Sequence, residues 1–234
     1  MNWSDAHPTH SLRNVPSWFF RHLENYDRLE RLSVSADEDI LSSLKNKPDG
    51  VIMSGSPRDA WDEDPMNYKL GEIILACRDR NIPFLGVCFG LQLMGRFLGG
   101  RVARNPNGLE LGVIDVSLTK AGRQNPIFQG FPEIFSVLQS HHDAVLDLPP
   151  GAELLASSAM TKTQSFAIAD YMAGVQFHPE MDADVLRYLW QPRLANWRAK
   201  TGQDLKPIMD GLTTPPTSWR VLTNFVDHFV LAQN

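Results

Sequence analysis

The sequence predicts an α/β fold in which helices flank a mostly parallel central sheet, with a small antiparallel extension and a helical C-terminal tail. Between about residues 29 and 180, short apolar runs alternate with segments of helical periodicity. This alternation is typical of parallel strands connected by helices. Residues 82–87 form an unbroken apolar run, which is expected of a strand buried on both faces. Residues 183–234 show mainly helical periodicity, which predicts the helical C-terminal tail.

Four elements are predicted in the first half of the chain. A strand at residues 51–53 ends in the loop SGSP at residues 54–57. An amphipathic helix covers residues 68–80. The apolar run at residues 82–87 gives a strand that we expect to be central, and a further helix covers residues 91–98. A strand, a sharp turn and a helix therefore follow one another directly.

The second half of the chain contains shorter strands and then helices. Strands at residues 112–118 and 134–138 are expected to form the antiparallel extension, while residues 166–169 and 174–177 resemble a hairpin. In the tail, apolar and aromatic residues recur at helical spacing and are expected to cover the sheet. Residues 200–216 resemble a connecting loop.

Length and composition indicate one domain. The chain has 234 residues, of which 43% are hydrophobic, enough for one large α/β core but not for two. We expect a single domain over residues 1–234, with the motif-bearing core at about residues 45–182 and the helical tail at residues 183–234.

Charge and hydropathy exclude several classes of function. The net charge is −5, and Lys and Arg form no dense basic run, so we expect no nucleic-acid partner. No apolar stretch is long enough for a membrane span, and residues 1–10 are polar and lack the apolar core of a signal peptide. We therefore expect a cytoplasmic protein with no membrane partner.

The chain has two cysteines, Cys77 and Cys88, and we expect both to be reduced. Cys77 continues the helical spacing of Leu70, Ile73 and Ile74, which is typical of a packed thiol on a buried helix face. Cys88 lies in a different setting and needs its own explanation.

The segment GVCFG at residues 86–90 has the pattern of a nucleophile elbow with sulfur in place of oxygen. The glycines leave room for a strained turn that exposes Cys88 between a strand and a helix. The positive end of that helix favours thiolate over thiol. This pattern makes Cys88 a candidate nucleophile, although a glycine on either side of a cysteine is also compatible with a structural thiol.

A candidate base lies in the segment GVQFHPE at residues 174–180. Pro179 restricts its own backbone and favours extended geometry at His178, so that His178 and Glu180 can project to the same side. A thiolate needs such a histidine within hydrogen-bond reach. Glu180 can then accept the second imidazole proton, which orients the ring.

At these residues the sequence resembles class I glutamine amidotransferases, which pair a Gly-x-Cys-x-Gly elbow with a later His-Pro-Glu. The resemblance covers about residues 45–182 and extends to the glutaminase domain of GMP synthetase and to stand-alone γ-glutamyl hydrolases. It implies a flavodoxin-like fold and a Cys88, His178 and Glu180 triad. In this family the cysteine forms a γ-glutamyl thioester, ammonia leaves with help from the histidine, and water or another acceptor releases the glutamyl group.

The resemblance also implies further site residues. Gly55 and Phe89 match positions whose backbone N–H groups form an oxyanion hole. Gln92 matches a position that contacts bound glutamine. The stretch SHHD beginning at Ser140 resembles the Ser-His-Gly-Asp stretch of the GMP synthetase glutaminase, which implies that Ser140 and His141 bind substrate.

No metal or cofactor is predicted. The neighbouring His141 and His142, followed by Asp143, suggest a metal at first sight, but adjacent side chains point apart in a strand and no third ligand is suitably spaced. The sequence also lacks the glycine-rich phosphate loop that ends in Lys and Ser or Thr. We therefore expect that ATP-dependent use of ammonia takes place elsewhere.

Three functions are compatible with the sequence. The first is hydrolysis of glutamine, with ammonia delivered to a separate synthetase subunit. The second is hydrolysis or transfer of γ-glutamyl groups from peptides or amides, since any acceptor that fits can open the thioester. The third is a binding or regulatory protein that keeps the fold without turnover, against which the complete triad argues.

One departure from the family pattern concerns the start of the chain. Family members open with a hydrophobic strand, and residues 1–10 contain no such run. We therefore expect the usual first strand to be missing.

Overall fold

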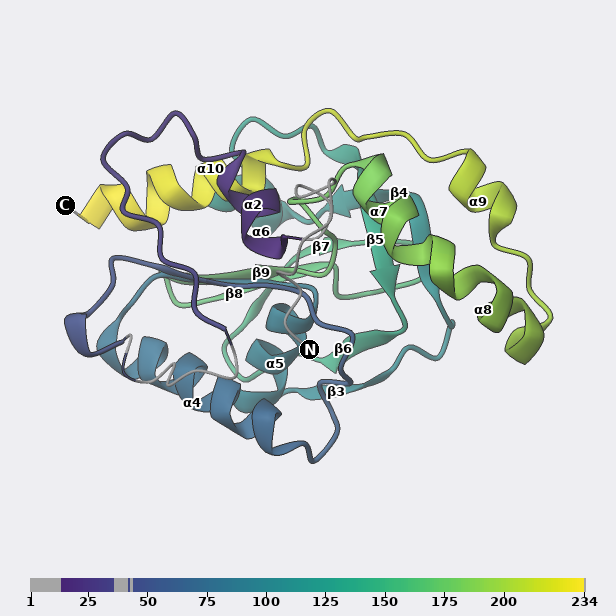
Figure 1. Ribbon diagram of the computed structural model, residues 1–234. Helices are drawn as coiled ribbons and strands as arrows, with labels where there is room; N and C mark the ends of the chain where they lie inside the picture. Colours follow the sequence, from purple (N-terminus) through teal and green to yellow (C-terminus); the bar gives the residue numbers. More distant parts are fainter. Residues whose placement is uncertain (1–13, 36–41, 43, 234) are drawn as a thin grey trace.

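The computed structural model describes residues 14–35, 42 and 44–233, and a seven-stranded sheet forms its centre (Figure 1). The strands lie in the order β1-β2-β9-β8-β7-β4-β5. Their bounds in that order are β1 (Val51–Met53), β2 (Phe84–Val87), β9 (Met172–Val175), β8 (Ser165–Ile168), β7 (Glu153–Ser157), β4 (Glu110–Leu118) and β5 (Ile134–His141). Parallel pairing joins β1 to β2 and β2 to β9, whereas the other four pairings are antiparallel. Because antiparallel neighbours alternate beyond β9, the strands β7 and β5 run in the same direction as β1, β2 and β9.

The predicted fold class is confirmed, and the antiparallel part is larger than expected. A short loop joins β8 to β9, so the two pair directly without the helical crossover that parallel neighbours need. The sequence predicts that β2 is central, but it lies second from the β1 edge. Its residues are nevertheless buried on both faces, because Phe84 packs into one apolar cluster and Leu85 and Val87 into another.

Two helices cover one face of the sheet (Figure 1). They are α4 (Pro65–Arg80) and α5 (Phe89–Phe97). The side chain of Asp64 caps the start of α4, and Asn81 ends it in the left-handed conformation. Ile73, Ile74 and Cys77 form its buried face, as their spacing predicts.

The other face is covered by elements from the start, the middle and the end of the described chain (Figure 1). The covering elements are α2 (Val15–Phe20), α6 (Lys120–Gln124), α10 (Arg220–Phe225) and the π-helical turn η4 (Val226–Val230). Phe225 and Phe229 are buried here together with Val221 and Leu222. The prediction that the aromatic residues of the tail cover the sheet is therefore confirmed for Phe225 and Phe229.

The rest of the tail extends past the β4–β5 end of the sheet (Figure 1). It consists of α7 (Ala183–Trp190), α8 (Leu194–Thr201) and α9 (Lys206–Asp210). Trp190 is buried in a cluster with Leu111 of β4 and Leu138 of β5. The prediction of a plain loop at residues 200–216 is wrong, because α9 lies within it; five residues are too few to produce a helical period in the sequence.

A second, two-stranded sheet was not predicted. It pairs β3 (Arg101–Arg104) with β6 (Asp143–Asp147) and packs against α5. Four short turns complete the described elements: η1 (Leu44–Asn46), η2 (Pro126–Phe128), η3 (Gln191–Arg193) and η5 (Leu231–Gln233).

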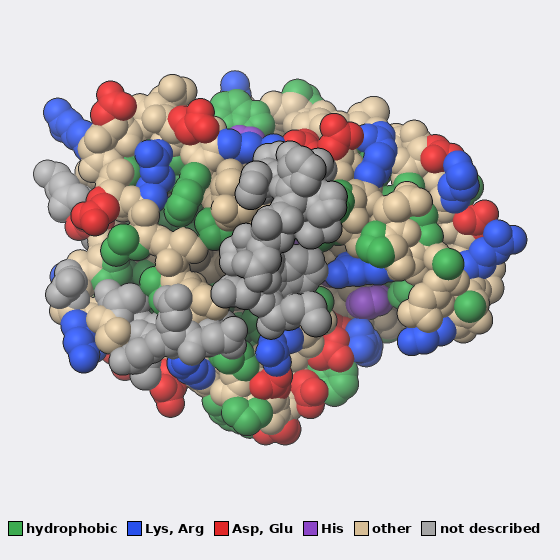
Figure 2. Space-filling view, viewed as in Figure 1, with side chains coloured by type: hydrophobic (Ala, Val, Ile, Leu, Met, Phe, Trp, Pro, Cys, Tyr) green, Lys and Arg blue, Asp and Glu red, His purple; other side chains and the backbone are tan. Residues whose placement is uncertain are grey.

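The expectation of a missing first strand concerns residues 1–10, which lie outside the described residues. On the face shown in Figure 2, acidic and basic side chains are interspersed. Among the helices of the described chain, none combines the length and apolar character needed to cross a membrane.

Candidate active site

Cys88 lies at the turn between β2 and α5, as the elbow pattern predicts. Its backbone has φ 52° and ψ −103°, a conformation that costs a residue with a side chain about 1–3 kcal/mol. The turn is fixed on both sides, because the Cys88 N–H donates to the Val175 carbonyl at 2.8 Å and the Cys88 carbonyl accepts from the Gln92 N–H at 3.0 Å. The strand end and the first turn of the helix thus hold the thiol in a strained position.

The glycines on either side of Cys88 are required by close backbone contacts. A Cβ on Gly86 would lie 2.6 Å from the Gly90 carbonyl carbon and 2.6 Å from the Leu91 nitrogen. A Cβ on Gly90 would lie 2.2 Å from the Met53 carbonyl oxygen. Neither backbone can move away cheaply, so the elbow needs glycine at both positions.

His178 and Glu180 lie in the segment that follows β9, the strand paired with β2. The Cys88 sulfur is close enough to the His178 ring to raise the pKa of the imidazole. On the other side of the ring, His178 Nδ1 lies 2.8 Å from Glu180 Oε1. Cys88, His178 and Glu180 are 5%, 5% and 1% exposed. Since Nδ1 faces Glu180, Nε2 is the ring nitrogen left for the sulfur.

The charges around His178 favour its protonated form. Burial alone would lower the pKa of His178, but the carboxylate of Glu180 and the sulfur of Cys88 raise this pKa well above its ordinary value. A protonated His178 ring is thus stabilised from both sides, by the carboxyl group of Glu180 and by the sulfur of Cys88. It can supply a proton to a leaving amine as well as activate the sulfur.

The loop after β1 closes one side of this cluster. A Cβ on Gly55 would lie 2.9 Å from His178 Cε1 and 3.6 Å from Cys88 Cβ, so the Gly55 backbone lies directly against the pair. Phe89 is the first residue of α5, and its N–H is one of the amides that a helix leaves without an intrahelical partner. Both predicted oxyanion-hole residues therefore lie next to Cys88.

Gln92 lies one turn into α5 and is 3% exposed. Its side-chain Nε2 donates to the Asp143 carbonyl at 2.9 Å and to Gln176 Oε1 at 3.2 Å. Gln176 Nε2 in turn donates to Cys88 Sγ at 3.5 Å. Gln176 is not among the predicted site residues. Its position two residues before His178 nevertheless places the two side chains on the same side of an extended chain.

His141 belongs to a buried network one step further from the sulfur. Its Nδ1 lies 2.8 Å from the Asp143 carbonyl, and its Nε2 lies 3.0 Å from Glu110 Oε2. Burial alone would raise the pKa of Glu110, but hydrogen bonds from His141, Ser158 and Thr161 lower it below its ordinary value. His141 is thus engaged with protein groups at both ring nitrogens.

The remaining predicted residues are placed differently. Ser140 Oγ accepts from Trp190 Nε1 at 2.8 Å, which ties Ser140 to α7. His142 is exposed and stacks on Trp197, while His141 is buried, so the two histidines do point apart. Within the part of the chain that the structure describes, no group of three His, Cys, Asp or Glu side chains is placed to hold a metal ion.

Cys77 is chemically unlike Cys88. It is fully buried on α4, and burial raises the pKa of its thiol to about 12, with a smaller opposing effect from Arg80. This confirms the prediction of a packed thiol.

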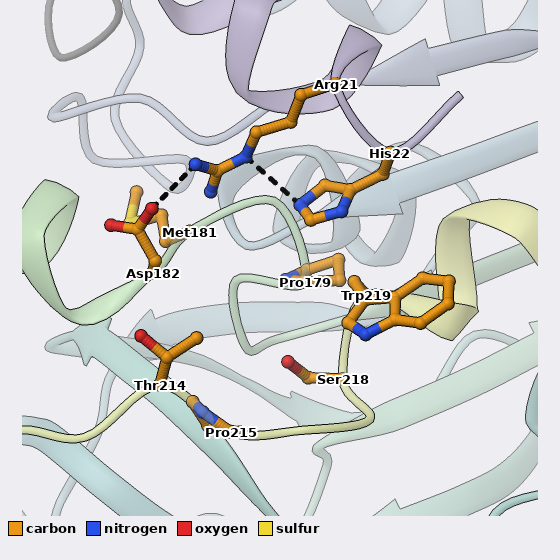
Figure 3. Close-up of a pocket in the computed structure, with 9 residues that line it drawn as sticks. All are labelled: Arg21, His22, Pro179, Met181, Asp182, Thr214, Pro215, Ser218 and Trp219. Atoms are coloured by element: carbon orange, nitrogen blue, oxygen red, sulfur yellow. Dashed lines mark hydrogen bonds and ion pairs between the residues drawn. The ribbon is translucent and has the colours of Figure 1, made fainter. Parts of the chain in front are cut away.

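A pocket of about 360 Å³ lies behind the His178–Glu180 segment (Figure 3). Arg21 and Asp182 point toward one another across it. Arg21 donates to Asp182 Oδ2 at 2.6 Å and to the Glu180 carbonyl at 2.7 Å. Pro179 lines the pocket, whereas the side chains of Cys88 and His178 do not. Arg21, just after α2, therefore clamps the segment that carries the histidine and the carboxylate.

This geometry can be compared with known proteins. The family described as glutamine amidotransferase class-I matches residues 18–187. The chain belongs to this family. The predicted resemblance is thereby confirmed, and this member of the class-I glutamine amidotransferases carries the elbow and the His-Pro-Glu segment within the matched region.

Curated relatives share part of their length with this family member. It is 37% identical over 142 residues to γ-glutamyl peptidase 4 of Arabidopsis thaliana, covering 60% of this chain and 57% of the peptidase. It is 38% identical over 141 residues to the glutamine-hydrolysing GMP synthase of Thermomicrobium roseum, covering 60% of this chain and 25% of the synthase. The match thus spans little more than half of the peptidase and a quarter of the synthase.

Solved structures show the same fold. A glutamine amidotransferase of Thermotoga maritima superposes with a TM-score of 0.62 at 26% identity, covering 76% of this chain and 77% of its own. A glutamine amidotransferase of Methylobacillus flagellatus gives a TM-score of 0.66 at 21% identity, covering 92% of this chain and 88% of its own. At 21% identity, the similarity to the Methylobacillus flagellatus protein shows a shared fold and no more.

Proposed function

We propose that this protein hydrolyses the γ-amide of glutamine through a γ-glutamyl thioester on Cys88. The observation that carries the proposal is the strained Cys88 turn with His178 and Glu180 aligned behind it. Membership of the class-I glutamine amidotransferase family supports it.

The geometry suggests the following steps. The Cys88 thiolate attacks the side-chain carbonyl carbon of glutamine, and the resulting oxyanion is stabilised by the backbone N–H groups of Gly55 and Phe89. His178 gives its proton to the departing nitrogen, so ammonia leaves and the thioester remains. Neutral His178 then takes a proton from a water molecule, whose oxygen attacks the thioester carbonyl. Glutamate leaves and the thiolate–imidazolium pair is restored.

The predicted substrate contacts of Gln92, Ser140 and His141 remain part of this proposal. Both amide hydrogens of Gln92 are used inside the protein, so its Oε1 is the atom that would meet the substrate, as an acceptor from the α-ammonium group. We place Ser140 and His141 in a supporting layer around this position rather than against the reacting atoms, because their side chains contact Trp190 and Glu110.

Hydrolysis of γ-glutamyl peptides is a second candidate, favoured by the 37% identity to a γ-glutamyl peptidase. The same thioester would form with an amine of a peptide as the leaving group. The loop after Gly55, which would face that leaving group, is held by defined contacts: Asn67 donates to the carbonyls of Asp59 and Asp62. A fixed loop of this kind can shape a subsite.

The setting of the activity is also part of the proposal. We place the whole chain in one domain in the cytoplasm, with glutamine or a γ-glutamyl compound as the small-molecule partner. A separate synthetase subunit would receive the ammonia, in line with the likeness to part of a GMP synthase. Neither a nucleic acid nor a membrane is a partner in this account.

The test offers glutamine and a panel of γ-glutamyl peptides to the purified chain and to Cys88→Ala. Release of glutamate from glutamine above that from peptides supports the first candidate, and the reverse preference supports the second. Ligand binding with no turnover of either class, and no covalent modification of Cys88, would contradict both and identify a binding protein of the same fold.

A further inference from the structure

The sulfur of Cys88 has a second polar neighbour besides His178. Gln176 is fully buried, and its Nε2 lies 3.5 Å from Cys88 Sγ. The backbone of Gln176 is fixed, because its N–H donates to the Gln164 carbonyl at 2.8 Å. A side chain with no exposure and a fixed backbone holds its amide against the sulfur in one orientation.

The orientation of the Gln176 amide follows from a chain of hydrogen bonds with only one consistent direction. The Asp143 carbonyl can only accept, so the end of Gln92 that faces it at 2.9 Å must be the NH₂ group. The same NH₂ group lies 3.2 Å from Gln176, which must therefore present its oxygen. The NH₂ group of Gln176 is then the end that faces Cys88. His141 Nδ1 also lies 2.8 Å from the Asp143 carbonyl. This carbonyl is therefore held in place at the start of the hydrogen-bond chain.

We propose that Gln176 is a further catalytic residue, whose amide N–H donates to the Cys88 thiolate and holds the sulfur in its reactive position, and that Gln92 is the positioning residue that sets the direction of this amide. The inference rests on the proposed role of Cys88 as nucleophile. A hydrogen bond from a neutral amide stabilises the charged sulfur more than the neutral thiol. It thus adds to the effects of His178 and the α5 N-terminus.

The experiment measures alkylation of Cys88 by iodoacetamide as a function of pH in the full chain, followed by mass spectrometry, together with kcat and KM. Gln176→Met keeps the volume and removes the donor. We expect it to raise the midpoint of the alkylation profile by about one pH unit, since hydrogen bonds to charged groups are worth about that much. We also expect kcat to fall about tenfold, with KM changed less than about twofold.

Three variants separate this role from a merely structural one. Gln92→Met should shift the midpoint in the same direction, and it should add no further shift in the Gln176→Met background, because both act through one amide. Gln176→Asn falls short of the sulfur by one methylene and should behave like Gln176→Met. Gln139→Met is the matched control, because Gln139 is a fully buried glutamine bonded to Gln164 rather than to the sulfur; its midpoint should equal that of the wild type.

Cys77 reports folding in every sample, because a buried thiol with a pKa of about 12 stays unlabelled in the native chain. An unchanged midpoint and kcat in folded Gln176→Met or Gln176→Asn would overturn the proposal. Additive shifts from Gln92→Met and Gln176→Met would overturn the role of Gln92. A further outcome is that the wild type hydrolyses neither glutamine nor γ-glutamyl peptides while Gln176→Met still shifts the midpoint. That result would contradict the proposed function but would support the hydrogen bond from Gln176 to the Cys88 sulfur.

Discussion

His178 Nδ1 lies 2.8 Å from Glu180 Oε1, and both side chains are almost fully buried. The carboxylate is thus placed to orient the ring and to stabilise its charge, while the other face of the ring meets Cys88. In the proposed reaction, Glu180 therefore acts only through His178.

The first prediction concerns the unequal roles of this pair. We expect His178→Ala to lower kcat by about 10⁴-fold, the upper range for a general acid–base group. Glu180→Gln should lower it by about ten- to a hundredfold, similar to losing the group that orients a metal-bound imidazole. Steady-state assays of glutamate release compare the two. Equal losses would show that Glu180 does more than orient the ring.

The second prediction concerns stability and pH. The pKa of His178 is raised in the folded protein, so the stabilisation from its charged form is complete below about 6.5, its ordinary unfolded value, and is lost as pH rises through the folded value. The free energy of unfolding of the wild type should therefore exceed that of Glu180→Gln most near about pH 6, and the difference should narrow as the pH rises further. Urea denaturation at several pH values measures it. A difference that widens with pH would contradict the assignment.

The third prediction concerns the space beside the imidazole. In Gly55→Ala, the new Cβ would lie 2.9 Å from His178 Cε1 and should displace the ring. We expect kcat to fall at least about tenfold, because small misplacements of reacting groups are costly. Gly211→Ala is the control, since its Cβ would meet nothing closer than 3.4 Å, and its kcat should not change. Wild-type kcat in Gly55→Ala would mean that His178 does not act in this position.

The fourth prediction concerns the Arg21 clamp. Arg21→Ala removes the hydrogen bonds to Asp182 and to the Glu180 carbonyl. The pair is about one-third exposed, so we expect a loss of about 1 kcal/mol in the free energy of unfolding and a fall in kcat as the His178–Glu180 segment loosens. Arg101→Ala removes a more exposed pair with Asp147 and should leave kcat unchanged. If both variants behaved alike in kcat, the clamp would have no role in placing the segment.

Much of the fold could be predicted because local patterns specify it. The apolar run of β2, the glycines around Cys88 and the buried spacing of α4 each act over a few neighbouring residues. The contact between His178 and Glu180 could be predicted for the same reason, since Pro179 fixes the relation of the two residues locally.

The contacts that support the site could not be predicted, because they join distant parts of the chain. Arg21 is 159 residues from the Glu180 carbonyl that it holds, and the six residues of α2 give no helical period to detect. Gln92 and Gln176 are 84 residues apart, and only the pairing of β9 with β2 brings them together. A buried glutamine also carries no pattern that separates it from an exposed one.

The most direct test of the account is whether Cys88 forms the covalent intermediate. The purified chain is treated with an electrophilic glutamine analogue and mapped by mass spectrometry, alongside Cys88→Ala and Cys77→Ala. We predict a single adduct on Cys88, none in Cys88→Ala, and unchanged modification and turnover in Cys77→Ala. Turnover that persists in Cys88→Ala, or equal losses in the two cysteine variants, would contradict the central claim.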